Sequence, residues 1–143
     1  LRRTPYKVRA RIPAGVEMDS YPGPLGQVLT NLLNNALTHG FEGRRHGLIE
    51  IVAEPLADDR VCLTVTDDGI GIPPALADRV FDPFVTSKLG RGGSGLGLHI
   101  VWSTVTAVLG GSISFTSEAG HGTTFRVIVP LVAPRQPPAS LTL

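Results

Sequence analysis

Three asparagines fall on one face of a predicted helix. Within NLLNNALTH (31–39), Asn31, Asn34, Asn35 and Thr38 are three or four residues apart, which gathers them opposite the leucines. Asparagine is a poor helix former, and solvated helix faces usually carry Glu, Lys, Arg or Gln instead. Its side chain offers a carbonyl oxygen to a hard cation and an amide donor to a phosphate. The stripe is therefore a candidate site for a cation and phosphates, with a plain solvated face as the alternative.

A carboxylate ends a predicted strand in VCLTVTDDGIGIP (61–73). Val61, Leu63 and Val65 share one face, and Asp67 continues it. An inward carboxylate is costly unless it accepts hydrogen bonds, and an exocyclic amine beside a ring edge, as in adenine, would donate them. Gly69 and Gly71 would let a flat ligand approach the backbone closely. The alternative is an ordinary Asp-Asp-Gly turn, in which we expect Asp68 to point to solvent.

A glycine run precedes a second predicted helix in GRGGSGLGLHIV (90–101), which has five glycines in its first eight positions. Backbone N–H groups at the start of a helix can bind phosphates. Its part GGSGLG (92–97) gives G-x-G-x-G rather than G-x-G-x-x-G. A polar segment, not a strand, precedes the run, which disfavours a dinucleotide-binding module. The chain also lacks a G-x-x-x-x-G-K-[ST] phosphate loop.

The elements that must position these groups follow from hydropathy patterning. The patterning predicts strands at 7–12, 48–53, 61–66, 112–117 and 123–130, and helices at 25–39, at 75–80 and from the glycine run to about 109. Tyr21–Pro24 is predicted to break the chain, Gly40 to cap the first long helix, and Gly110-Gly111 to end the second. This order predicts a two-layer α/β sandwich with a mixed sheet of about five strands on about three helices.

Composition narrows the class of protein. The 143 residues suffice for one domain with a core, and a net charge of +1 gives no reason to expect nucleic acid or an anionic membrane as a partner. Cys62 is the only cysteine, which excludes a disulfide framework and a cysteine-based zinc site. No run approaches the roughly 18 apolar residues of a membrane span. We expect a cytoplasmic fragment of a longer protein, with the domain at 1–132 and a proline-rich disordered tail at 133–143.

Taken together, these motifs resemble the ATP-binding catalytic domain of sensor histidine kinases, within the superfamily that includes the gyrase, Hsp90 and MutL ATPase domains. The segments similar to the family's boxes are NLLNNALTH (N box), DDGIGIP, FDPF (81–84, F box), GGSGLGL (92–98) and GHGTTF (120–125). All five occur in family order between about residues 7 and 131. The resemblance implies a Bergerat-type fold with a short ATP lid near 85–93, and ATP with Mg²⁺ as ligands.

The resemblance also implies roles for individual residues. Asn35 matches the Mg²⁺-ligating asparagine, His39 a position that lines the nucleotide, Asp67 the acceptor of the adenine amine, and Thr123 a contact to the adenine edge. The turn from lid to helix, with Gly93, Gly95, Leu96 and Gly97, would present backbone N–H groups to the phosphates. The full nucleotide-binding set implied is Asn31, Asn35, Thr38, His39, Asp67, Gly69, Gly71, Ile72, Phe84, Thr86, Ser87, Lys88, Gly93, Ser94, Gly95, Leu96, Gly97, Leu98 and Thr123.

Two departures from the family bear on mechanism. Many members carry Lys or Arg where this chain has Thr38, so a phosphate-neutralising charge is missing from the helix. Lys88, in FVTSK, could supply that charge, with Arg91 as a second candidate and exposed lid charges as the alternative for both. His99 and Trp102, on the helix after the glycine run, are interpreted as packing or surface residues.

Asn31 separates the candidate functions. Gyrase- and Hsp90-like ATPases carry a glutamate there to activate water, and an amide cannot accept that proton. We therefore expect phosphoryl transfer, with Asn31 and Lys88 as catalytic residues that act through positioning and charge. The alternatives are an ATPase or anti-sigma-type serine kinase of the same fold, and a catalytically degenerate nucleotide-binding module.

The expected partners follow from the kinase interpretation. In the family that this chain resembles, the acceptor histidine lies next to an acidic residue on a dimerising helical hairpin. The histidines of this chain, His39, His46, His99 and His121, do not lie in such a helix. The resemblance therefore implies an acceptor histidine on a separate dimerisation domain. A response regulator would act downstream. We expect the isolated domain to be a monomer that contacts neither nucleic acid nor membrane, with the full-length protein either soluble or anchored in the inner membrane.

Overall fold

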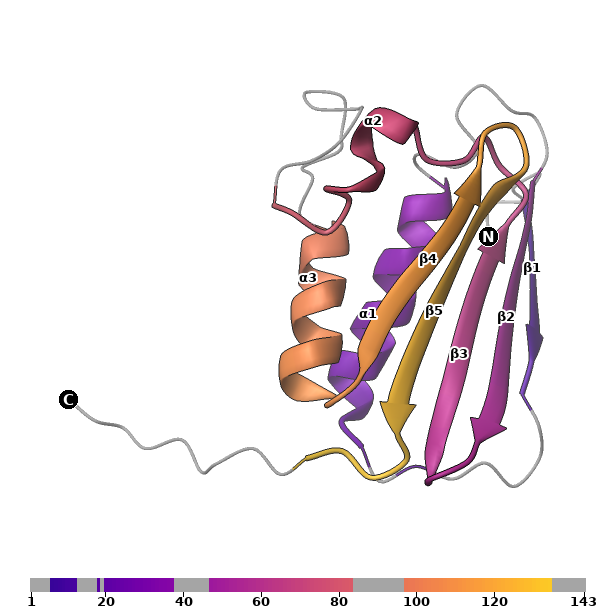
Figure 1. Cartoon of the computed structure of the whole chain (residues 1–143). Helices are drawn as coiled ribbons and strands as arrows, with labels where there is room; N and C mark the ends of the chain where they lie inside the picture. The colour runs from indigo at the N-terminus through magenta and orange to yellow at the C-terminus, as the bar shows by residue number, and fades with distance from the viewer. Residues whose placement is uncertain (1–5, 13–17, 19, 38–46, 84–96, 135–143) are drawn as a thin grey trace.

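One mixed sheet forms the framework of the molecule (Figure 1). The computed structural model describes residues 6–12, 18, 20–37, 47–83 and 97–134. The strands are β1 (Tyr6–Arg11), β2 (Gly47–Leu56), β3 (Arg60–Asp67), β4 (Ser112–Glu118) and β5 (Gly122–Pro130), in the order β1-β2-β3-β5-β4. The pair β1 and β2 is parallel, and the other pairs are antiparallel. The predicted strands are all confirmed.

Helices cover one face of this sheet (Figure 1). They are α1 (Pro22–Asn35), the short α2 (Pro74–Ala77), and α3 (Gly97–Ser103), which continues as the π-helical turn η2 (Thr104–Val108). The prediction of a two-layer α/β sandwich with a mixed sheet is confirmed. No helix in the described part of the chain is long and apolar enough to cross a membrane.

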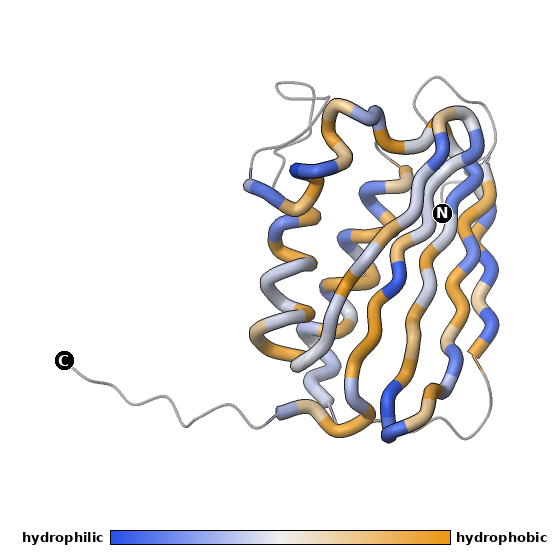
Figure 2. The backbone as a smooth tube through the Cα atoms, viewed as in Figure 1, coloured by the Kyte–Doolittle hydropathy of each residue, from blue (hydrophilic) through white to orange (hydrophobic). Residues whose placement is uncertain are grey.

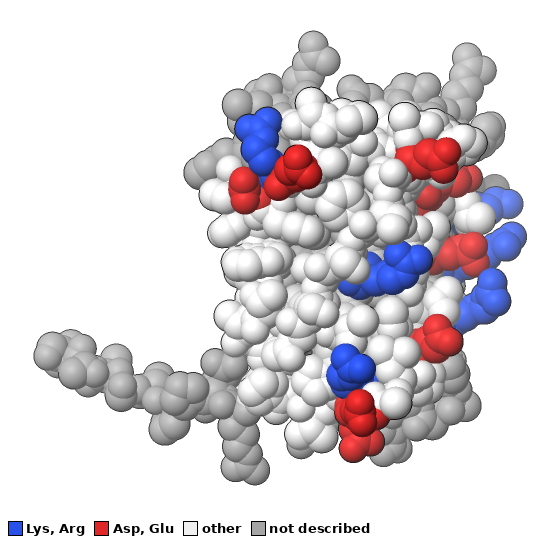
Figure 3. Space-filling view, viewed as in Figure 1, with Lys and Arg blue, Asp and Glu red and all other residues white. Residues whose placement is uncertain are grey.

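The core lies between the helices and the inner face of the sheet. Val61, Leu63 and Val65 alternate along β3 and are at most 7% exposed, which is the pattern of a strand with one buried face (Figure 2). Phe125 from β5 and Leu32 from α1 are the largest of the fully buried side chains. Across the view of Figure 3, basic and acidic side chains are interspersed, and Arg11 and Glu50 form an ion pair at 3.3 Å between β1 and β2.

The first long helix begins earlier than predicted. The segment Tyr21–Pro24 does not break the chain, because α1 starts at Pro22 and the first helical hydrogen bond runs from the Leu25 N–H to the Tyr21 carbonyl at 3.0 Å. Proline is tolerated in the first helical turn, whose N–H groups have no partner within the helix. The α-helical part ends at Asn35, and the predicted end at 38–39 and the predicted cap Gly40 lie outside the described residues.

The two later helices also differ in detail from the prediction. Instead of running to Val80, α2 ends at Ala77, and turn bonds such as Arg79 N–H to Leu76 carbonyl, at 2.9 Å, follow it. The predicted helix up to Leu109 is confirmed, but its second half is π-helical. There the Thr106 hydroxyl donates to the Trp102 carbonyl at 2.8 Å, which competes with the regular α-helical bond to the same oxygen.

The β2–β3 turn and residues 133–134 are ordered by local backbone geometry and by contacts to Tyr21 and the core. Asp58 and Asp59 both have positive φ (63° and 54°) in the turn between β2 and β3, a conformation that Asp adopts more readily than most residues. The Tyr21 hydroxyl donates to the Pro134 carbonyl at 2.9 Å, and Ala133 is buried. Residues 135–143 of the predicted tail lie outside the described residues.

Candidate functional site

Asp67 is the last residue of β3, where it pairs with Thr123 of β5. Both residues are polar but only 6% exposed, and they lie on the sheet face that carries the helices. The Gly69 N–H donates to Asp67 Oδ1 at 2.9 Å. Asp67 thus makes the local turn bond typical of Asp-x-Gly, and it is also buried, as the strand alternation predicts.

The neighbouring Asp68 does more than point to solvent. Asp68 is exposed, but its Oδ1 accepts a hydrogen bond from the Leu48 N–H at 2.9 Å. The Asp68 N–H in turn donates to the Leu48 carbonyl at 3.3 Å. These bonds extend the pairing of β2 and β3 by one step past Asp67. Asp68 therefore helps to fix the backbone from which the buried carboxylate projects.

Chain packing requires a glycine at two positions near Asp67, Gly71 in the loop after β3 and Gly122 at the start of β5. Gly71 has φ +82°, and a Cβ there would lie 2.6 Å from the Glu118 carbonyl oxygen. Gly122 has φ +103°, and its Cβ would lie 2.0 Å from the Asp67 carbonyl oxygen. At Gly71 the space that a side chain would fill is occupied by the β4–β5 turn, so chain packing by itself requires a glycine there.

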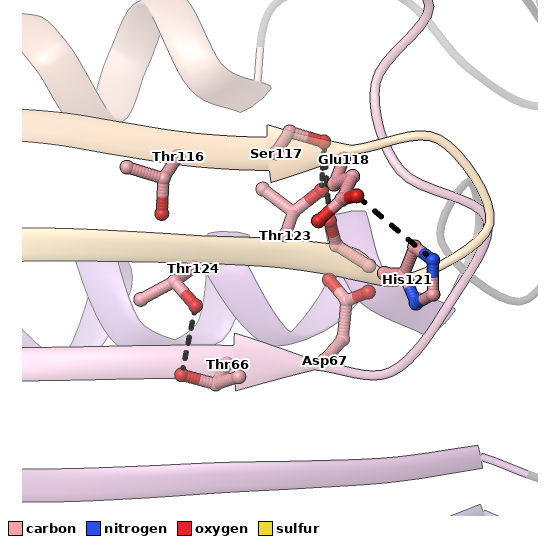
Figure 4. A pocket seen from close by; sticks show the side chains of 9 residues that line it. Thr66, Asp67, Thr116, Ser117, Glu118, His121, Thr123 and Thr124 are labelled. Carbon is pink, nitrogen blue, oxygen red and sulfur yellow. Dashed lines mark hydrogen bonds and ion pairs between the residues drawn. The ribbon is translucent and has the colours of Figure 1, made fainter.

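Ser117 connects these segments and was not predicted from the sequence. Its Oγ accepts the Ile72 N–H at 2.7 Å and lies 3.0 Å from Thr123 Oγ1 and 3.2 Å from the Gly122 carbonyl oxygen (Figure 4). Ser117 follows Ile113 and Phe115 on the inward side of β4. A polar residue that continues an apolar alternation is the same signal that identified Asp67, and it could have identified Ser117.

A hollow of about 280 Å³ lies at this end of the sheet (Figure 4). Its lining residues are Thr66, Asp67, Thr116, Ser117, Glu118, His121, Gly122, Thr123 and Thr124. By strand alternation Thr66, Thr116 and Thr124 point away from the helices, whereas Asp67, Ser117 and Thr123 point toward them. The hydroxyls of Thr66 and Thr124 are 3.2 Å apart. The strand ends are thus polar on both faces of the sheet.

The asparagine stripe divides in the structure. Asn34 is exposed, whereas Asn31 and Asn35 are half-buried on the flank of α1 next to its core side. Asn31 Oδ1 accepts a hydrogen bond from Gln27 at 2.7 Å, and Asn31 Nδ2 donates to the Gly97 carbonyl at 3.4 Å. Asn31 therefore joins α1 to the first residue of α3.

His99 of α3 contacts the backbone of Phe81, in the F box. His99 Nδ1 lies 3.1 Å from the Phe81 carbonyl oxygen, so residues on either side of 84–96 are held together. Phe81 packs edge-on against Phe115 and Phe125, with ring centroids 5.9 and 6.3 Å apart. His99 also stacks on Trp102, which is 44% exposed. The interpretation of His99 as a packing residue holds, with the added contact to Phe81.

The described members of the predicted set form two groups. Asp67, Gly69, Gly71, Ile72 and Thr123 meet where β3, β5 and the loop after β3 come together, and Asn31 meets Gly97 between α1 and α3. Ile72 and Leu98 pack against the hydrophobic core. The remaining members lie outside the described residues: Thr38, His39, Phe84, Thr86, Ser87, Lys88, Gly93, Ser94, Gly95 and Leu96.

Known proteins resemble this chain in sequence. A family model described as "Histidine kinase-, DNA gyrase B-, and HSP90-like ATPase" matches residues 21–133. The chain is 43% identical over 107 residues to the sensor histidine kinase AruS of Pseudomonas aeruginosa, covering 71% of this chain and 10% of AruS. The chain thus spans a small part of that relative.

Solved structures agree with the sequence matches. The catalytic domain of the histidine kinase ThkA superposes with a TM-score of 0.76 at 25% identity, covering 90% of this chain and 80% of that one. Full-length ShkA, solved in complex with AMPPNP, gives a TM-score of 0.70 at 27% identity over 92% of this chain and 27% of ShkA. Because the family model covers residues 21–133 and both the sequence and the fold match histidine kinases, the chain belongs to the histidine kinase-, DNA gyrase B- and HSP90-like ATPase family, as an ATP-binding catalytic domain of the sensor histidine kinase type.

Proposed function

We propose that this domain binds Mg·ATP and donates the γ-phosphoryl group to a histidine on a dimerisation domain outside these 143 residues. The observation that carries the proposal is the buried Asp67 carboxylate at the end of β3, paired with Thr123 and held by the Gly69 N–H. A buried carboxylate is stabilised by donors, and the 6-amino group of adenine is a neutral donor that needs no counter-charge. The complex of ShkA with AMPPNP supports a nucleotide with an adenine base.

The residues of α1 fit a magnesium ion held mainly by phosphates. Mg²⁺ in phosphoryl-transfer sites takes one or two protein oxygens and completes its shell with substrate phosphates and water. Asn35 offers one such oxygen from the half-buried flank of α1 and would hold the ion. Asn31, one turn earlier, already forms hydrogen bonds with Gln27 and Gly97. It would instead hold the start of α3 against α1. When bound, Mg²⁺ would neutralise part of the negative charge on the phosphates.

Asn31 favours kinase over ATPase chemistry. Its amide oxygen accepts from Gln27 and has no basicity near neutral pH, so it cannot take a proton from water. ATP would be held without rapid hydrolysis until the acceptor histidine arrives. Lys88 and the segment 93–97 would add phosphate contacts, as the resemblance implies. By analogy with its sensor histidine kinase relatives, the domain would have a response regulator as its downstream partner and would act in the cytoplasm.

Loss of the Asn35 amide should weaken nucleotide binding only when Mg²⁺ is present. In Asn35→Ala we expect the affinity for Mg·ADP, measured by calorimetry, to fall about tenfold, because one ligand oxygen is lost. Asn34→Ala is the matched control on the same helix, since Asn34 is exposed. An affinity lowered equally with EDTA would show that Asn35 does not act through the ion.

The isolated chain should bind ATP but neither label itself nor turn ATP over. With γ-labelled ATP we expect no acid-labile, alkali-stable label on the chain and hydrolysis near the uncatalysed background. When the full-length protein, or its dimerisation hairpin, is added, label should appear on the hairpin. Steady turnover by the chain alone would favour the ATPase alternative, and phosphohistidine on the chain itself would contradict an external acceptor.

A further inference from the structure

Ser117 joins the loop that follows Asp67 to the hairpin that carries Thr123. The Ile72 N–H donates to Ser117 Oγ at 2.7 Å across 45 residues of sequence. The Gly120 N–H donates to the Ile70 carbonyl at 2.9 Å, and Gly71 fits against the Glu118 carbonyl. The loop after Asp67 thus packs on the β4–β5 hairpin, and Ser117 makes the side-chain contact to it. Figure 4 shows Ser117 beside Thr123 at the end of this hairpin.

The three contacts of Ser117 fix the direction of its hydrogen bonds. The Ile72 N–H can only donate and the Gly122 carbonyl can only accept. A serine hydroxyl has one proton, so donation to Gly122 leaves Thr123 as the donor in the third contact, at 3.0 Å. All three contacts are satisfied together only in this arrangement. The Thr123 proton is then directed at Ser117, and Thr123 Oγ1 has lone pairs left for a ligand.

We propose that Ser117 is a positioning residue that sets base selectivity by holding the Thr123 hydroxyl as an acceptor beside the Asp67 carboxylate. Two acceptors on paired residues favour a base edge that brings donors, such as the 6-amino group of adenine or a water on that edge. A 6-oxo purine presents an acceptor there instead. This inference rests on the proposed binding of adenine at Asp67.

The test is the ratio of affinities for ADP and for inosine diphosphate, which carries a 6-oxo group. Wild type should prefer ADP, and Ser117→Ala should lower the preference about three- to tenfold, since the freed Thr123 hydroxyl can rotate and donate to the oxo group. Ser117→Thr, which keeps a hydroxyl, should retain the preference. A role in stability alone would lower both affinities equally and leave the ratio unchanged, which would overturn the inference.

Two further variants make the result specific. On a Thr123→Val background, Ser117→Ala should no longer change the ratio, because the hydroxyl that it orients is gone. Thr66→Val is the matched control, because it removes a threonine–threonine contact on the other face of the same strand ends. If Ser117→Ala does not fold, Thr123→Val alone must lower the ratio, and an unchanged ratio overturns the inference. Failure of wild type to bind ADP would instead refute the proposed function.

Discussion

Asp67→Asn should lower the affinity for ADP and ATP about tenfold to a hundredfold, the scale of a hydrogen bond to a charged group. The change is nearly isosteric, and the remaining amide oxygen can still accept the Gly69 N–H, which bonds to Asp67 Oδ1 at 2.9 Å. What is lost is the charge, and the new NH₂ group would oppose the adenine amine with a second donor. Calorimetry on the folded variant measures the effect directly.

Asp68→Asn is the matched control for this experiment. It makes the same chemical change one residue later, at an exposed carboxylate whose Oδ1 accepts the Leu48 N–H. We expect near wild-type nucleotide affinity there. Unchanged affinity in Asp67→Asn would refute the adenine assignment, and equal losses in both variants would point to a shared effect on the backbone after β3.

Gly122→Ala should be among the most destabilising single substitutions in the chain. The glycine has φ +103°, and a Cβ would lie 2.0 Å from the Asp67 carbonyl oxygen and 2.9 Å from Asp68 Cα. Backbone atoms of a paired strand cannot move aside as a flexible side chain can, so the hairpin must separate from β3. We expect a loss of about 3–5 kcal/mol in the free energy of unfolding, from strain and overlap together.

Gly120→Ala isolates the conformational part of that cost. Gly120 lies in the same turn with φ +81°, but a Cβ there meets nothing within 4 Å. Denaturant unfolding should therefore show a loss of only about 1 kcal/mol. Nucleotide affinity should also fall in Gly122→Ala, because the overlap displaces Asp67. Equal destabilisation by the two alanines would mean that close packing of the hairpin on β3 is not the main constraint at Gly122.

Much of the fold follows from local patterning. The period-2 alternation of Val61, Leu63 and Val65 identified β3, and the period of Leu25, Val28 and Leu32 identified α1, because each reflects one buried face. The helix start was wrong because proline acts as a breaker only inside a helix, and Pro22 opens α1. The π-helical turn at 104–108 does not follow from the sequence, because apolar periodicity does not separate one i→i+5 turn from a regular α-helical turn.

Within the candidate site, the sequence identifies residue types that could bind a ligand, and the tertiary structure shows what each described residue contacts. Asn31 and Asn35 were selected together with Asn34, and the fold separates them by burying one flank of α1. Gly71 was explained by a ligand, whereas its neighbour is the Glu118 carbonyl. Ser117 was passed over, although it bonds the loop after Asp67.

The sequence by itself determined the order of the elements, the buried faces and the family motifs, because periodicity and residue chemistry are properties of neighbours along the chain. The tertiary structure alone decided which distant segments meet: Asn31 with Gly97 across 66 residues, and Ile72 with Ser117 across 45. The physical reason is that a polar group or a glycine acquires its function from the backbone that packs across it. The packing of α3 beside α1 brings Gly97 to Asn31, and the packing of the loop after β3 on the β4–β5 hairpin brings Ile72 to Ser117.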